Sequence, residues 1–167
     1  MGLDISFYSN IGAAVDPALL DEDGEFIDWK NEDEHVRIYA NDDFPERADG
    51  MTSGYYVGES NGGFRAGSYG GYNRWRSELC VAALGCAPID IWNGDVTEGP
   101  FYELINFSDC EGVIGPKTSA KLAKDFADWE DKIGAMVDGD VDYFMEKFRD
   151  WKMAFEAAAG SGAVCFH

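Results

Sequence analysis

The strongest constraint on the fold is a pair of aromatic stripes at helical spacing in the C-terminal third of the chain. Large apolar side chains recur every three or four residues in two windows, about Lys117–Val137 and Val141–Ala159. This period is typical of amphipathic helices that bury one face. The sequence therefore predicts two long helices that pack together or against a sheet. Their buried faces would carry Leu122, Phe126, Trp129, Ile133 and Met136 in the first window, and Phe144, Phe148, Trp151 and Phe155 in the second.

Alternating segments predict the strands of that sheet. Leu3, Ile5 and Phe7 alternate with polar residues in residues 2–9. Further strand candidates are His35–Ala40, Tyr55–Val57, Phe64–Ala66, Phe101–Phe107 and Ala163–Phe166, with 55–57 and 64–66 expected to form a hairpin. A third helix is predicted at about Tyr72–Leu84, ended by Gly85.

These elements predict an α+β fold, an antiparallel or mixed sheet covered by about three helices. The 167 residues and their 46% hydrophobic content are typical of one packed domain. Within it we expect an acidic, loop-rich insertion at about 17–34 and a helical C-terminal part at 116–160. No apolar run approaches the roughly 20 residues of a membrane helix, and no signal-peptide pattern is present. We therefore expect a cytoplasmic protein, with the four cysteines as reduced thiols.

The acidic balance limits the classes of partner. The chain has 32 acidic and 13 basic residues, a net charge of −19. Direct nucleic-acid binding is disfavoured because phosphate contacts need clustered Lys and Arg. Asp21–Asp49 concentrates twelve acidic residues against Lys30, Arg37 and Arg47. This segment would suit a basic partner by imitating a polyanion; the alternative is a solvated face that keeps the protein soluble.

The segment Asn61–Leu79 is the one local island of positive charge. It holds five glycines and three arginines, with no acid before Glu78. A glycine-rich loop before a helix N-terminus can hold an anion, such as a nucleotide. The candidate ligand-binding residues are Arg65, Ser68, Tyr69, Tyr72, Asn73, Arg74 and Arg76. The alternative is a structural loop whose arginines pair with the protein's own carboxylates.

A second candidate site is the turn Asp109-Cys110-Glu111. Asp109 and Glu111 could act as acid and base, or bind a divalent metal. The alternative is a solvated turn. A His-rich zinc site is excluded because the chain has only His35 and His167. No cofactor is predicted, and a divalent metal stays an alternative at these two carboxylates.

Three motifs carry a family resemblance: MGLDISFYS, FRAGSYGGYNRWR and ELINFSDCEGVIGPKTSAKLAKDF. With them the chain resembles, over nearly its full length, small proteins of bacteriophages and prophages of Gram-negative bacteria that begin MGLDI. The family has no established activity, so no site residue is transferred. The resemblance implies an accessory protein in the cytoplasm of the infected host.

Two functional hypotheses follow. The first is a phage accessory protein that binds and inhibits or sequesters a host or defence component, through its acidic surface or through a pocket for a small anion. The second is a hydrolase or transferase acting on a phosphate-bearing substrate, with arginines holding the phosphate and Asp109 and Glu111 doing the chemistry.

Overall fold

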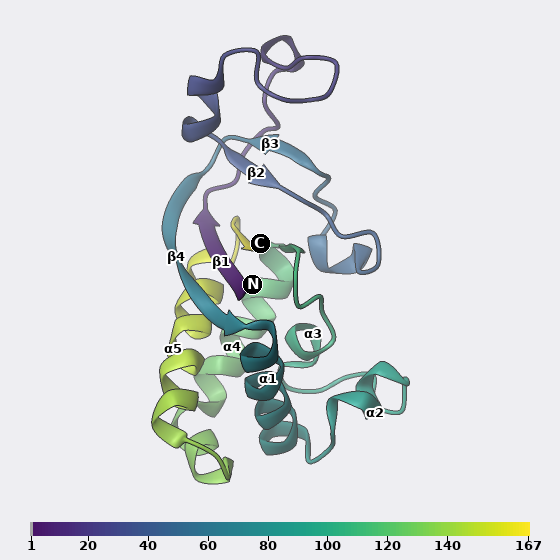
Figure 1. Cartoon of the computed structure of the whole chain (residues 1–167), viewed down its shortest axis with the longest axis vertical. Helices are drawn as coiled ribbons and strands as arrows, with labels where there is room; N and C mark the ends of the chain where they lie inside the picture. Colours follow the sequence, from purple (N-terminus) through teal and green to yellow (C-terminus); the bar gives the residue numbers. More distant parts are fainter. Residues whose placement is uncertain (1) are drawn as a thin grey trace.

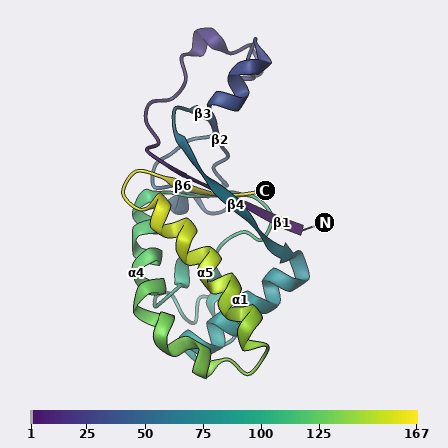
Figure 2. The ribbon, with the colours of Figure 1, turned by 90° about the vertical axis from the view of Figure 1, so that its left-hand side faces the viewer.

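The computed structural model describes residues 2–167 and has an α+β architecture in three layers. A four-stranded antiparallel sheet lies between helices on one face and a loop-rich lobe on the other (Figures 1 and 2). The sheet order is β4-β1-β6-β5, and a separate two-stranded ribbon pairs β2 with β3. The strands are β1 (Gly2–Ser9), β2 (Val36–Ile38), β3 (Gly54–Tyr56), β4 (Glu59–Ser68), β5 (Gly112–Ile114) and β6 (Ala163–Phe166).

Three long helices and two short ones complete the fold. The long helices are α1 (Tyr69–Leu84), α4 (Pro116–Ile133) and α5 (Val141–Ala158), and the short ones are α2 (Pro88–Trp92) and α3 (Tyr102–Ile105). Four 3₁₀ turns link them: η1 (Pro17–Leu19), η2 (Trp29–Glu34), η3 (Pro45–Ala48) and η4 (Gly134–Met136). Pro116 opens α4 and Gly85 ends α1 with φ 69°, as the sequence predicts.

The predicted aromatic stripes form the main core. The Trp151 indole of α5 lies 5.1 Å from the Phe64 ring of β4, 6.0 Å from Trp75 of α1 and 5.4 Å from Phe166 of β6, centroid to centroid. One residue therefore joins two strands and two helices. Of the predicted stripe, Leu122, Phe126, Ile133, Phe144, Phe148, Trp151 and Phe155 are fully buried. Trp129 is partly buried against this core, and Met136, which lies in η4 beyond the end of α4, is half exposed.

The opposite face of the sheet packs against the lobe. Residues alternate across β6, so that Val164 and Phe166 face the helices while Ala163 and Cys165 face the ribbon. Val36 and Ile38 of β2 and Ala48 of η3 complete this second, smaller core, with Val113 of β5. The base of the lobe is therefore fixed to the sheet by apolar burial.

The predicted strand Phe101–Phe107 is wrong, because this segment contains the short helix α3. Phe101, Leu104 and Ile105 are all fully buried, and their i, i+3 and i+4 spacing suits one helical turn. Phe101 has φ 60° and donates its N–H to Asp125 Oδ2 at 2.8 Å. The apolar residues that suggested a strand are those of a buried helical turn.

The predicted loop and hairpin around the glycines are also wrong. The first part of the glycine-rich segment, as far as Ser68, belongs to β4, which pairs with β1, whereas β3 pairs with β2. A Cβ on Gly63 would lie 2.6 Å from the Ile5 carbonyl oxygen, so glycine lets the two strands approach. The helix that follows begins at Tyr69, three residues earlier than predicted, because Ser68 Oγ caps it by accepting from Gly71 N at 3.0 Å.

The four cysteines are free thiols, as the sequence predicts. Cys80 and Cys165 are buried, and burial raises the pKa of each to about 12. Neither is suited to act as a thiolate nucleophile at neutral pH.

Replacing a glycine by alanine at the start and at the end of α1 should change the free energy of unfolding in opposite directions. Gly70→Ala places a methyl group in open space near the start of α1, so we expect about 0.5 kcal/mol of added stability. Gly85→Ala forces a side chain to φ 69°, so we expect a loss of about 1 kcal/mol. Urea unfolding of the two variants measures both. A gain from Gly85→Ala would contradict the left-handed cap.

Candidate functional site

The arginines of the glycine-rich segment do not converge on one pocket. Arg65 lies on the exposed strand β4, and its Nη1 donates to both carboxylate oxygens of Asp4 at 3.1 Å. Arg74 is exposed on α1 and borders a separate hollow with Glu78 and Asp140. Only Arg76 lies beside the turn that contains Asp109 and Glu111. The segment therefore supplies one cation, not three, to that turn.

Arg76 is buried and bonded to the protein itself. Its Nη1 donates to the Phe107 carbonyl at 2.6 Å, and its Nη2 donates to Asn73 Oδ1. Asn73 Nδ2 in turn donates to Asp109 Oδ2 at 2.7 Å. The predicted residues Arg76, Asn73 and Asp109 thus form one hydrogen-bonded chain. The guanidinium carbon lies 5.0 Å from the centre of the Tyr72 ring, which favours a cation–π contact.

The remaining predicted ligand residues do not join this hydrogen-bonded chain. Tyr72 is fully buried in the core, where desolvation raises the pKa of its hydroxyl to about 12. Ser68 caps α1. Tyr69 is half-buried and lines a neighbouring hollow with Glu111 and His167.

Next to Arg76 is a cleft of about 520 Å³ between the lobe and the helical layer. Its wall has Asp42 and Asp43 on the lobe side and Asp109 and Glu111 on the other side. Tyr39 and Trp92, each half exposed, add aromatic surface. Four carboxylates surround one guanidinium that is already bonded, so the cleft has a negative field that suits a cation better than an anion. Among residues 2–167 no group of three or more His, Cys, Asp or Glu is placed to hold a metal ion.

The acidic lobe, residues 21–49, contains more carboxylates than the cleft does. In Figure 1 its first part, around η2, lies at the top, beyond the sheet, whereas its last part, around η3, lies beside the sheet. Two of its basic residues are used internally: Arg37 Nη2 pairs with Glu25 at 2.7 Å, and Arg47 pairs with Glu46 at 3.1 Å. The exposed carboxylates that form no ion pair within the described part of the chain are Asp21, Glu22, Asp23, Asp28, Glu32, Glu34, Asp42 and Asp43.

The lobe has an ordered interior. Glu25 also accepts from the Tyr55 hydroxyl at 2.7 Å, and burial together with this bond raises the pKa of Tyr55 to about 12. The Phe26 ring packs 5.0 Å from the His35 ring and 4.6 Å from the Tyr55 ring. The carboxylates around this small interior are therefore displayed by folded structure.

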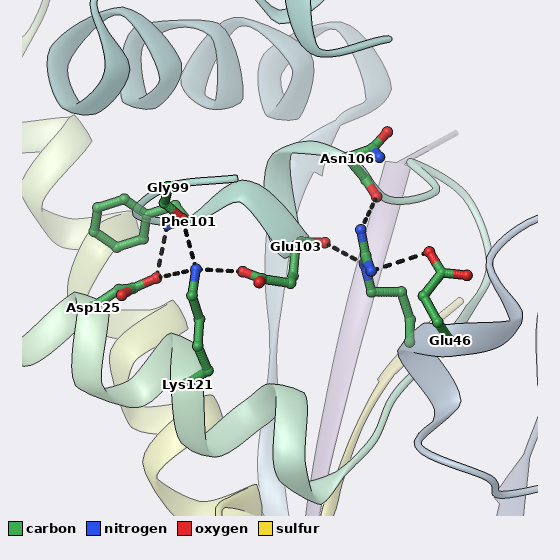
Figure 3. A network of polar contacts seen from close by, with 8 residues as sticks. Glu46, Gly99, Phe101, Glu103, Asn106, Lys121 and Asp125 are labelled. Atoms are coloured by element: carbon green, nitrogen blue, oxygen red, sulfur yellow. Dashed lines mark hydrogen bonds and ion pairs between the residues drawn. The ribbon is translucent and has the colours of Figure 1, made fainter. Parts of the chain in front are cut away.

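Arg47 fixes the base of the lobe to the body of the protein. The residue is 6% exposed, and its guanidinium donates to the carbonyl oxygens of Glu103 at 3.1 Å and Asn106 at 3.3 Å. Figure 3 shows the carboxylate of Glu103 turned the other way, toward Lys121 of α4, whose Nζ lies 2.5 Å from it and 2.8 Å from Asp125. The sequence interpretation gave Arg47 no role, because the two partners that join it to the body are backbone carbonyls, which leave no sequence signal.

No protein-family model, curated protein sequence or solved structure matches this chain. Over the described residues, no helix combines the length and apolar character needed to cross a membrane.

The two outer arginines of the glycine-rich segment should differ in their effect on stability. Arg76→Met leaves the Phe107 carbonyl and Asn73 without a buried donor, so we expect a loss of about 3 kcal/mol. Arg65→Met removes an exposed ion pair and should cost less than about 1 kcal/mol. Urea unfolding compares them. Equal losses would mean that Arg76 is not held as described.

Proposed function

We propose that this chain is a phage or prophage accessory protein that works by binding. Its target would be a host or defence protein with a basic surface, which it blocks or sequesters in the host cytoplasm. The observation that carries the proposal is the set of exposed, unpaired carboxylates displayed on the acidic lobe. A fixed array of this kind complements Lys- and Arg-rich surfaces, including those that otherwise bind nucleic acid. The phage context comes from the sequence resemblance.

Binding of the target protein should depend on where the negative charges of this chain lie as well as on how many there are. Four substitutions in the lobe, Glu22→Gln, Asp23→Asn, Asp42→Asn and Asp43→Asn, remove four exposed acids. The matched control, Asp95→Asn, Glu98→Gln, Asp131→Asn and Asp138→Asn, removes four exposed acids outside the lobe and gives the same net charge. We expect wild type and control to capture the same protein from a bacterial lysate, and the lobe variant to lose it.

The captured protein, once purified, allows a quantitative test. Its dissociation constant for wild type should rise by about tenfold or more between roughly 50 and 300 mM salt, because exposed charges are screened. The lobe variant should bind more weakly than the control at low salt. A salt-insensitive complex, or equal binding by the two variants, would contradict the proposal.

The enzyme hypothesis has one observation in its favour. Arg76 and Asp109 are joined through Asn73 by hydrogen bonds, and both border the same cleft as Glu111. Three further carboxylates besides Asp109 repel a phosphate-bearing substrate there, so the binding function is the better supported of the two.

Small anions should therefore fail to stabilise the protein. A ligand at 100 times its dissociation constant adds about 2.7 kcal/mol, which shifts the melting temperature of a domain of this size by roughly 5–10 °C. We expect nucleotides, cyclic nucleotides and phosphate each to give no shift of that size in a thermal-shift screen. A clear shift with one nucleotide that Glu111→Gln alters would favour the enzyme instead.

A further inference from the structure

Three large apolar side chains are exposed at the N-terminal end of the acidic lobe and just before it in the chain. Leu19, Ile27 and Trp29 have exposed fractions of 41%, 71% and 69%. We refer to these three residues as the apolar tip. Ile27 N donates to the Leu19 carbonyl at 3.0 Å, which places the two residues side by side on adjoining segments. Trp29 follows two residues after Ile27, at the first position of η2.

The apolar tip is exposed because the lobe buries its alternate residues. Phe26 packs against His35 and Tyr55, whereas Ile27, its neighbour in the chain, is 71% exposed. The backbone at Trp29 is ordered by the cap of η2, where Asp28 Oδ1 accepts from Lys30 N at 3.2 Å. Less backbone entropy is therefore lost on association than for a disordered segment.

Carboxylates border the tip. Asp28 lies between Ile27 and Trp29 in the chain, and Asp16 and Asp21 flank Leu19 and its neighbour Leu20. Lys30 is the one basic residue in the segment Asp16–Glu34. An exposed Trp within a charged rim is the arrangement found at energetic centres of protein interfaces.

Charge decides which occupant fits. A second copy of the chain would bring two lobes of the same strong negative charge together, and an anionic membrane surface would repel the lobe in the same way. A purely polyanion-binding groove offers Lys and Arg but no contact for Ile27 and Trp29.

From this we infer that the apolar tip is the anchor of a protein-docking surface, and that its occupant is a cationic amphipathic protein segment. Such a segment would place apolar side chains on Ile27 and Trp29 while its Lys and Arg side chains meet the surrounding carboxylates. This inference rests on the proposed function and adds that charge alone does not account for binding.

Two synthetic peptides with equal numbers of lysines test the inference on the full chain. One peptide has Leu and Lys at helical spacing, and the other is oligolysine. We expect the amphipathic peptide to bind at least tenfold more tightly, and the double variant Ile27→Ala, Trp29→Ala to lose that advantage. The control, Ile89→Ala with Met153→Ala, removes two half-exposed large apolar side chains that lie outside the lobe and outside the cleft, and should keep it. Isothermal calorimetry gives the dissociation constants.

The outcomes separate this inference from the proposed function. The anchor is refuted if both peptides bind wild type equally and the tip variant, Ile27→Ala with Trp29→Ala, binds as wild type does. The charge-driven function still stands in that case if the lobe variant with four acids replaced by amides binds both peptides weakly. If the lobe amide variant binds both peptides as wild type does, the proposed function fails as well. Binding of wild type to phosphatidylserine vesicles through Trp29 would also overturn the inference, since the occupant would then be lipid. Far-UV circular dichroism of each variant checks that it folds.

Discussion

The arrangement of the lobe depends on the burial of one cation, Arg47. Twelve acidic residues in Asp21–Asp49 repel one another, and a segment of that charge needs a fixed attachment to stay folded against the body. Arg47 supplies it by donating to the carbonyls of Glu103 and Asn106. The same turn is held from its backbone side, because Gly115 N donates to the Arg47 carbonyl at 2.7 Å. Asp49 then caps α4 by accepting from Thr118 N at 2.8 Å.

Arg76 repeats this arrangement on the other side of α3. A helix of four residues leaves most of its carbonyl groups without an intrahelical partner, and buried carbonyls need donors. Arg47 supplies donors to Glu103 and Asn106, and Arg76 supplies one to Phe107. Each guanidinium also lies over a tyrosine ring, Tyr102 at 5.6 Å and Tyr72 at 5.0 Å. The two buried arginines therefore clamp an irregular segment between the lobe and α1.

The sequence predicted what depends on periodicity and missed what depends on distant partners. The aromatic faces of α4 and α5, the strand β1 and the cap at Gly85 follow from local patterns, and all are confirmed. The strand assigned to Phe101–Phe107 failed because a buried helical turn and a buried strand both give apolar runs. The three arginines do not form one site, because Arg65 and Arg76 bond to residues far away in the chain, Asp4 and Phe107.

The placement of positive charge accounts for the surface that the lobe presents. Arg37, Arg47, Arg65 and Arg76 are bonded to the protein's own carboxylates or carbonyls, and Lys121 is paired with Glu103 and Asp125. These five basic residues therefore stabilise the folded protein. The exposed carboxylates of the acidic lobe that form no ion pair are left without a neutralising partner. Their negative field speeds encounter with any basic surface and discriminates poorly among them. Ile27 and Trp29 can add the missing selectivity, because an apolar contact requires a partner with matching shape as well as opposite charge.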